Sequence, residues 1–422
     1  MDLDLKTRAA EIVRSLPRAE RIALLSGRDL WHLKGVATAG VPPLMITDGP
    51  HGLRKQGGDG TGIDLSATVP ATCFPPSATL ASSWDPGLAE AVGRAIGTEA
   101  RAEKVAVVLG PGLNLKRHPG CGRNFEYFSE DPLLGGSMAA ALVRGIQSTG
   151  VGACLKHFAL NEQETNRMTV DVIVDERTER ELYLRGFEIA VTKGRPWTVM
   201  CAYNRVNGEY CSDSARLLTD VVRTEWGFDG LVMSDWGATN DRVQGLRAGL
   251  DLEMPSSSGA NDVLVARALD DGTLEEATLD QAACRIVELM LRALPAVCAD
   301  GAYDAGEHHL LARRTAAEST VLLANDGLLP LRPHGRIAVI GRFAEEPRYQ
   351  GAGSSQITPT RIDAFLPALR DLAPGADILY APGYGLPHSP PDEEALQQAC
   401  RTAAEADAPV VLVGLPGPYE SE

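Results

Sequence analysis

Short apolar runs rich in β-branched residues alternate with longer helical patterns over about the first 300 residues of the chain. The segments between the runs carry apolar residues at three-to-four spacing, and their first turns are rich in acidic residues. The runs are residues 44–47, 105–110, 152–158, 197–204, 230–236 and 249–254. A repeated strand-then-helix pattern predicts an α/β fold built on a parallel sheet.

Polar or charged side chains follow most of these runs at the point where each run ends. They are Asp48, Lys156, His157, Tyr203, Asn204 and Asp235. The carboxyl ends of successive parallel strands are where a (β/α) barrel builds its active site. The sequence therefore predicts a barrel with these side chains around one cavity.

A second pattern begins near residue 301. A predicted helix over 305–325 leads into a turn with Gly327 and Pro330, followed by strand candidates at 336–341 and 407–415. We expect a barrel over residues 1–300, a linker helix and turn over 301–330, and the first part of an α/β sandwich over 331–422. Because the chain stops soon after a core strand, the sandwich is expected to be incomplete and the sequence to be a fragment.

The composition narrows the choice of partners. A formal net charge of −16, spread along the chain, disfavours nucleic acid and anionic membranes and fits a small-molecule substrate. No stretch approaches the roughly 20 apolar residues of a membrane span, and the amino terminus lacks the pattern of a signal peptide. A cytoplasmic location with reduced cysteines is expected. The oligomeric state stays open, a homo-oligomer included.

Asp235 in the segment VMSDWGAT is the sharpest catalytic candidate. It ends a buried run beside Trp236 and a glycine turn, a position that packing alone does not explain. A retaining glycosidase needs one ionised carboxylate as nucleophile and one carboxylic acid as proton donor, roughly 5–5.5 Å apart. The alternative is that Asp235 only caps the following helix, where aspartate is favoured.

Three further segments gather polar side chains suited to sugar hydroxyls. LKHFALNEQETNR carries Lys156, His157 and Arg167, although an adjacent Lys and His are often merely solvated. TDGPHGLR carries Asp48 and Arg54, with a plain Asp-Gly turn as the alternative. The long loop GPGLNLKRHPGCGRNFEYFSEDP crowds several charges that a structural ion network would explain equally well, namely Arg117, Arg123, Glu126, Glu130 and Asp131.

Together these segments resemble glycoside hydrolase family 3, the β-glucosidase and β-xylosidase family. The resemblance covers nearly the whole chain in order and extends to MCAYNRVNG, GLDLEMP, VLLANDGLLPL, GAGSSQITP and VVLVGLPGPYESE. It implies a TIM-like (β/α)8 barrel followed by an α/β sandwich, with the active site between them. No metal or other cofactor is implied.

The resemblance also implies residue roles. By position in the motifs, Asp235 is similar to the family nucleophile, and Ser354 or Ser355 of GAGSSQITP would reach the sugar. The acid/base glutamate falls on Glu422, with Glu420 as the nearby substitute. The residues that match those holding the terminal sugar are Asp48, Arg54, Arg123, Lys156, His157, Arg167 and Tyr203, with Trp236 beside them.

The implied activity is that of a retaining β-glucosidase acting on a small glycoside. Asp48 favours glucose, because xylosidase-like relatives often have glutamate at this position. The alternatives are a β-xylosidase or α-arabinofuranosidase of the same family, and a catalytically weak sugar-binding fragment. The N-acetylglucosaminidase branch is disfavoured, since its KHFPGHG loop is replaced by KHFALNEQETNR.

Overall fold

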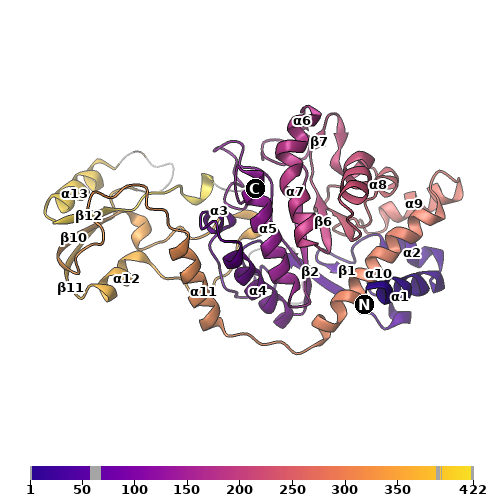
Figure 1. Ribbon diagram of the computed structural model, residues 1–422, viewed down its shortest axis with the longest axis horizontal. Helices are drawn as coiled ribbons and strands as arrows, with labels where there is room; N and C mark the ends of the chain where they lie inside the picture. Colours follow the sequence, from indigo (N-terminus) through magenta and orange to yellow (C-terminus); the bar gives the residue numbers. More distant parts are fainter. Residues whose placement is uncertain (1, 58–67, 386–389, 391, 420–422) are drawn as a thin grey trace.

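The computed structural model describes residues 2–57, 68–385, 390 and 392–419. Its larger part is a curled sheet surrounded by helices, and a smaller α/β layer lies beyond helix α11 (Ala305–Glu318) (Figure 1). The predicted α/β class, a barrel followed by a second α/β unit, is confirmed. The boundaries at residues 300 and 330 stay a prediction.

The curled sheet has the order β1-β2-β3-β4-β6-β9. Its strands are, in that order, His32–Leu33, Leu44–Asp48, Val105–Leu109, Gly152–Phe158, Thr198–Cys201 and Leu231–Ser234. From β2 to β9 neighbouring strands pair in parallel. Single bridges continue the curl from Met233 to Leu252 and from Glu253 to Ser26, which precedes β1. These parallel strands are buried along their whole length, which is why they read as continuous apolar runs.

Helices lie between and around these strands, and the sequence carries clear signals for where several of them begin. Asp85 and Asp131 each accept a hydrogen bond from the backbone two residues later, and a proline follows each at the first helical position. Pro17 separates the first two helices. The helices of this part are α1 (Asp2–Ser15), α2 (Arg18–Leu24), α3 (Ser77–Ala81), α4 (Pro86–Ala102), α5 (Pro132–Gln147), α6 (Glu176–Thr178), α7 (Arg185–Ile189), α8 (Arg242–Ala248), α9 (Ala260–Asp270) and α10 (Glu276–Cys298).

Two details of the barrel differ from a uniform strand-helix repeat. Strand β1 runs antiparallel to β2, because the short connection between them holds only a 3-10 turn at Ala37–Ala39 and no crossover helix. The predicted run 249–254 forms single bridges instead of a strand. Several backbone groups of this run form hydrogen bonds with side chains and not with a neighbouring strand. Arg242 donates to the carbonyls of Leu250 and Asp251, and the Met254 amide donates to Ser234 Oγ.

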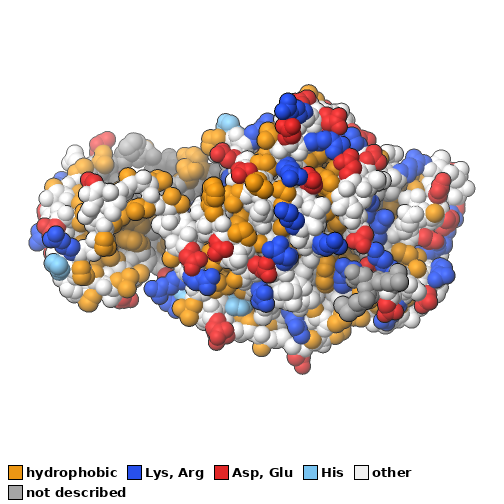
Figure 2. Space-filling view, in the orientation of Figure 1, with side chains coloured by type: hydrophobic (Ala, Val, Ile, Leu, Met, Phe, Trp, Pro, Cys, Tyr) orange, Lys and Arg blue, Asp and Glu red, His pale blue; other side chains and the backbone are white. Residues whose placement is uncertain are grey.

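The smaller unit is a three-stranded parallel sheet in the order β11-β10-β12. Its strands are His334–Ile340 (β10), Gly375–Ala381 (β11) and Ala408–Val411 (β12), and its helices are α12 (Phe365–Leu372) and α13 (Glu393–Ala404). The sequence did not single out β11. Many apolar side chains of this unit are exposed, as the orange atoms on its visible face show (Figure 2).

Three short strands lie outside both sheets and pair with one another. They are β5 (Asp171–Val172), β7 (Arg205–Val206) and β8 (Glu209–Tyr210). Within the described ranges, no helix is both long and apolar enough to cross a membrane.

Candidate active site

A cavity of about 550 Å³ opens at the carboxyl ends of the barrel strands. Ten of the residues that the sequence singled out line it: Asp48, Arg54, Arg123, Lys156, His157, Arg167, Tyr203, Asp235, Trp236 and Ser354. Residues from positions 48 to 354 therefore meet around one space. For the residues at strand ends that convergence follows from the fold, because parallel strands present their carboxyl ends at the same rim of the sheet.

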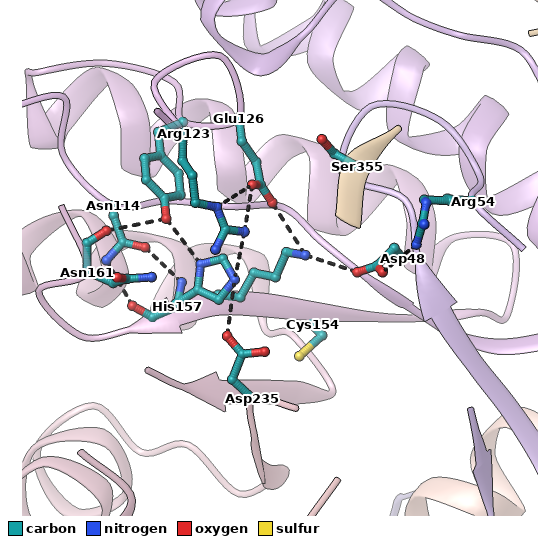
Figure 3. Close-up of polar contacts among 12 residues, drawn as sticks. Asp48, Arg54, Asn114, Arg123, Glu126, Cys154, His157, Asn161, Asp235 and Ser355 are labelled. Carbon is teal, nitrogen blue, oxygen red and sulfur yellow. Dashed lines mark hydrogen bonds and ion pairs between the residues drawn. The ribbon is translucent and has the colours of Figure 1, made fainter. Parts of the chain in front are cut away.

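A chain of alternating charges forms one wall of the cavity (Figure 3). Lys156 Nζ lies 3.2 Å from Asp48 Oδ1 and 3.3 Å from Glu126 Oε1. On the far side of Glu126, Arg123 donates from Nε and Nη2 to Oε2 at 3.0 and 2.7 Å. On the far side of Asp48, Arg54 Nη1 lies 3.4 Å from Oδ2. The cations of this wall are thus held in place by carboxylates before any substrate arrives.

Glu126 is the centre of this network and is fully buried. Burial alone would raise the pKa of its carboxyl group, but the charges of Arg123 and Lys156 lower that pKa to about 2. Glu126 is therefore ionised at neutral pH. The sequence identified Glu126 only as one of several crowded charges, either in a structural ion network or beside a site. In the structure it forms ion pairs with two residues of the site, Arg123 and Lys156.

His157 lies at the end of β4, between this wall and Asp235. Its Nε2 is 3.2 Å from Arg123 Nη2 and 3.6 Å from Asp235 Oδ2, and its Nδ1 is 3.2 Å from the hydroxyl of Tyr127. Asn114 holds the backbone on both sides, accepting from the His157 amide and donating to its carbonyl at 2.8 Å each. Burial first, and then the charges of Arg123, Lys156 and Arg167, hold the pKa of His157 well below its usual range. The imidazole is therefore neutral.

Asp235 directly follows β9 and is 8% exposed. Its Oδ1 accepts a hydrogen bond from the Trp236 amide at 2.8 Å, which fixes the orientation of the carboxylate at the floor of the cavity. The Trp236 indole donates to the Leu30 carbonyl at 2.9 Å and packs against Trp31, with ring centroids 5.3 Å apart. An oriented carboxylate thus lies beside an apolar wall, within the reach of any sugar that fills the cavity.

Arg167 and Tyr203 also line the cavity. The Arg167 guanidinium donates to Glu164 at 2.8 Å and lies 4.9 Å from the centre of the Tyr203 ring. The Tyr203 hydroxyl donates to the Trp236 carbonyl at 3.0 Å. These contacts join the loop after β4 to the loops after β6 and β9.

The smaller unit contributes one loop to the cavity. Ser354 lines the cavity, whereas the buried Ser355 donates its hydroxyl to the Ala352 carbonyl at 3.1 Å and is absent from the cavity wall. Arg54 Nε donates to the Gln356 carbonyl at 3.0 Å and so connects the loop to the barrel. Glu420 and Glu422 lie outside the described residues.

Five lining residues were not selected from the sequence, although Met200, Gly353 and Gln356 lie in the motifs MCAYNRVNG and GAGSSQITP. Leu30, Trp31, Met200, Gly353 and Gln356 complete the cavity. Only an aromatic residue near a strand, such as Trp31, resembles a sugar-stacking position, and many core tryptophans share that pattern. In the described part of the chain, no three His, Cys, Asp or Glu side chains gather in an arrangement that could hold a metal ion.

Comparison with known proteins identifies relatives over both units. Residues 36–289 match the "Glycosyl hydrolase family 3 N terminal domain" and residues 320–422 the "Glycosyl hydrolase family 3 C-terminal domain". The chain is 53% identical, over its whole length and 56% of the relative, to thermostable beta-glucosidase B of Acetivibrio thermocellus. It is 49% identical, over 97% of its length and 55% of the relative, to an exo-alpha-(1->6)-L-arabinopyranosidase of Bifidobacterium longum.

Solved structures of beta-glucosidases are also similar to this chain. The GH3 beta-glucosidase of Bifidobacterium adolescentis is similar with a TM-score of 0.91 and 48% identity, over 97% of this chain and 59% of that one. Beta-glucosidase 3B of Thermotoga neapolitana in complex with alpha-D-glucose has a TM-score of 0.82 and 38% identity, over 94% of this chain and 56% of that one. The chain spans about half the length of the curated relatives it matches. On its motifs, its fold and the matches to both domains, the chain belongs to glycosyl hydrolase family 3.

Proposed function

We propose that the protein hydrolyses terminal non-reducing β-D-glucosyl residues with retention of configuration. The observation that carries this proposal is the oriented Asp235 carboxylate on the floor of a cavity otherwise lined by charged, hydroxyl and aromatic side chains. Such a lining suits a sugar ring, which offers several hydroxyl groups and an apolar face. Relatives named as beta-glucosidases support the same activity.

In the proposed double displacement, Asp235 attacks the anomeric carbon while the bond to the aglycone oxygen breaks. A carboxylic acid, Glu422 or its substitute Glu420, protonates the departing oxygen. A water molecule that the same residue deprotonates then attacks the anomeric carbon and releases Asp235. Both glutamates lie outside the described residues, so their part rests on the resemblance alone.

The wall of alternating charges would bind the sugar. Lys156, Arg123 and Arg54 can only donate hydrogen bonds, and Asp48 can only accept them, so the wall can satisfy both sides of neighbouring hydroxyls. Contacts that tighten as the ring flattens would contribute to the rate. The three-part domain division and a cytoplasmic location remain predictions of the sequence alone.

The direct test is hydrolysis of p-nitrophenyl β-D-glucoside by the chain and by two variants. Asp235→Ala is expected to lower kcat by about a thousandfold or more, since it removes the nucleophile. Asp229→Ala, an exposed carboxylate at the opposite end of the same strand, serves as the matched control. Equal rates for the chain and for Asp235→Ala would leave at most a sugar-binding fragment. A fluorinated glucoside should label Asp235, and labelling of another side chain would contradict the mechanism.

A second activity is favoured by one observation, the 49% identity to an exo-alpha-(1->6)-L-arabinopyranosidase. The ratio of kcat/KM for p-nitrophenyl β-D-glucoside and p-nitrophenyl α-L-arabinopyranoside distinguishes the two. A larger value for the arabinoside would replace the glucosidase assignment without changing the role of Asp235. The β-xyloside and α-arabinofuranoside analogues belong in the same series, because they represent the other activities implied by the resemblance.

A further inference from the structure

The two ring nitrogens of His157 have different neighbours, and the difference determines where the proton lies. Nε2 faces Arg123 Nη2 at 3.2 Å, and Nδ1 faces the Tyr127 hydroxyl at 3.2 Å. His157 is 2% exposed, and each ring nitrogen has a protein partner at hydrogen-bond distance. Figure 3 shows His157 between Arg123, Asn161 and Asp235.

Arg123 fixes the role of Nε2. A guanidinium has five N–H donors and no acceptor, so its contact with Nε2 is a hydrogen bond only if Nε2 accepts. The remaining geometry of Arg123 agrees: Nε and one N–H of Nη2 are directed to Glu126 Oε2, at 3.0 and 2.7 Å, which leaves the second N–H of Nη2 for His157. Nε2 therefore presents its lone pair.

The role of Nε2 fixes that of Nδ1. A neutral imidazole carries one proton, so a lone pair on Nε2 places the proton on Nδ1. Nδ1 then donates to the Tyr127 hydroxyl oxygen, and the hydroxyl proton is donated to the Asn161 carbonyl at 3.3 Å. All three contacts are satisfied by this one arrangement of protons.

The opposite tautomer loses two of these contacts. A proton on Nε2 would face the Arg123 N–H, and Tyr127 would have to donate to Nδ1 instead of the Asn161 carbonyl. Among the described side chains, the acceptor that this proton would face is Asp235 Oδ2. Its distance from Nε2 is 3.6 Å, which is beyond hydrogen-bond length. Because Tyr127 is fully buried, its lost partner is not replaced by solvent.

We propose that Tyr127 is a positioning residue that, together with Arg123, holds His157 as the Nδ1–H tautomer, so that Nε2 accepts a hydrogen bond in the active site and donates none to Asp235. A consequence, which rests on the proposed function, is that Asp235 keeps its full negative charge for attack on the anomeric carbon. The lone pair of Nε2 is already used by the Arg123 N–H, so a substrate hydroxyl near the ring receives no proton from His157. Tyr127 reaches the reaction only through His157, since it does not line the cavity.

The first test needs no turnover. The full chain is labelled with ¹⁵N-histidine, and the signals of His157 are assigned by their absence in His157→Asn. The expected pattern is a protonated Nδ1 and a non-protonated Nε2 at neutral pH. A protonated Nε2 would overturn the proposal even if the chain hydrolyses β-glucosides, and the expected pattern would stand even if it does not.

The second test removes the hydroxyl of Tyr127. In Tyr127→Phe the Nδ1 proton loses its acceptor, so the preference for the Nδ1–H tautomer should weaken and the fraction of His157 protonated at Nε2, on the side of Asp235, should rise. The kcat for p-nitrophenyl β-D-glucoside should then fall roughly tenfold, the size of one lost buried hydrogen bond, with a smaller change in KM. The matched control is Tyr384→Phe, whose hydroxyl also accepts from an N–H and donates to a carbonyl but lies in the smaller unit.

A purely structural role for Tyr127 would give a different result. Lower stability with an unchanged Nδ1–H pattern and an unchanged kcat per folded molecule would overturn the positioning role. If Tyr127→Phe does not fold, the tautomer of the unsubstituted chain still decides whether Nε2 accepts a hydrogen bond.

Discussion

The barrel and the smaller α/β unit bury their strands to very different extents. Strands β2, β3, β4, β6 and β9 are buried at every residue, whereas in β12 exposed and half-buried residues alternate. In the smaller unit Leu372 and Val413 remain 71% and 79% exposed. The charged wall of the active site stands entirely on the barrel. A deep core is what allows several buried charges to be held at fixed distances.

The loop that carries Ser354 lies in the second half of the sequence but is attached to the barrel. The Ala71 amide donates to the Thr358 carbonyl, and the Thr360 amide donates to the Ala71 carbonyl, both at 2.9 Å. Gln350 braces the loop from inside through two hydrogen bonds to the backbone of Ile357. Hydrogen bonds therefore hold the active-site loop to the barrel, and we expect the loop to open only when the barrel unfolds.

The largest predicted effect is a separation of the two units during unfolding. The described sheet of the smaller unit has only three strands, and many of their residues are exposed or half-buried, so its amides should open at a free energy on the order of 5 kcal/mol below that of β3 and β4. All five tryptophans lie in the barrel, so their fluorescence reports on that unit alone. In urea, far-UV circular dichroism should begin to change before tryptophan fluorescence does.

Hydrogen exchange tests the same comparison residue by residue. The amides of β10 should exchange early, and those of Ile357 and Thr360 should exchange with the barrel. Coincident urea transitions, together with equal protection in β4 and β10, would show that the two units unfold as one.

The next effect concerns the centre of the charged wall. Glu126→Gln removes the negative charge shared by Arg123 and Lys156, two cations buried in the barrel. Breaking a buried ion network in this way costs roughly 3–5 kcal/mol. We expect the free energy of unfolding in urea to fall by that amount, with tryptophan fluorescence as the probe of unfolding. Glu130→Gln, an exposed carboxylate of the same loop, is the matched control. A loss below about 1 kcal/mol in Glu126→Gln would mean that the wall does not depend on its central carboxylate.

A smaller effect depends on pH. His51 is buried in the barrel near Lys156, and burial lowers its pKa to about 4. Between pH 6.5 and 4 the unfolded chain binds a proton at this residue and the folded chain does not. Stability from this residue is therefore complete above pH 6.5 and is lost as the pH falls towards 4, by up to about 3 kcal/mol.

The measurement compares the chain with His51→Asn at pH 7 and pH 4.5. The difference between their unfolding free energies should shrink on acidification, because contributions from other groups cancel in the difference. His334→Asn, an exposed histidine of the smaller unit, is the control. A difference that stays constant with pH would contradict the shift at His51.

Much of the barrel could be predicted from the sequence, because buried parallel strands read as apolar runs and their polar ends face one rim. The same logic placed Asp48, Lys156 and Asp235 together from their positions at the ends of those runs. It failed where tertiary contacts decide. The choice between Ser354 and Ser355 depends on which hydroxyl turns inward, and the role of Glu126 depends on Lys156, a cation from a different segment, as well as on the neighbouring Arg123. Strand β11 was not predicted, because most of its residues are exposed or half-buried and so do not form a clear apolar run.

The smallest predicted effect tests whether burial, and not the number of ion pairs, separates the two units. Arg336 and Asp377 form an exposed pair in the smaller unit at 3.0 Å, and Arg180 and Glu225 form one on the barrel at 2.7 Å. Solvent and salt screen both pairs, so Asp377→Asn and Glu225→Gln should each cost less than about 1 kcal/mol, and less still at high salt. Urea unfolding at low and high salt measures both, by circular dichroism for the first and tryptophan fluorescence for the second. A cost of several kcal/mol in only one unit would mean that its surface charges, and not the depth of its core, set its stability.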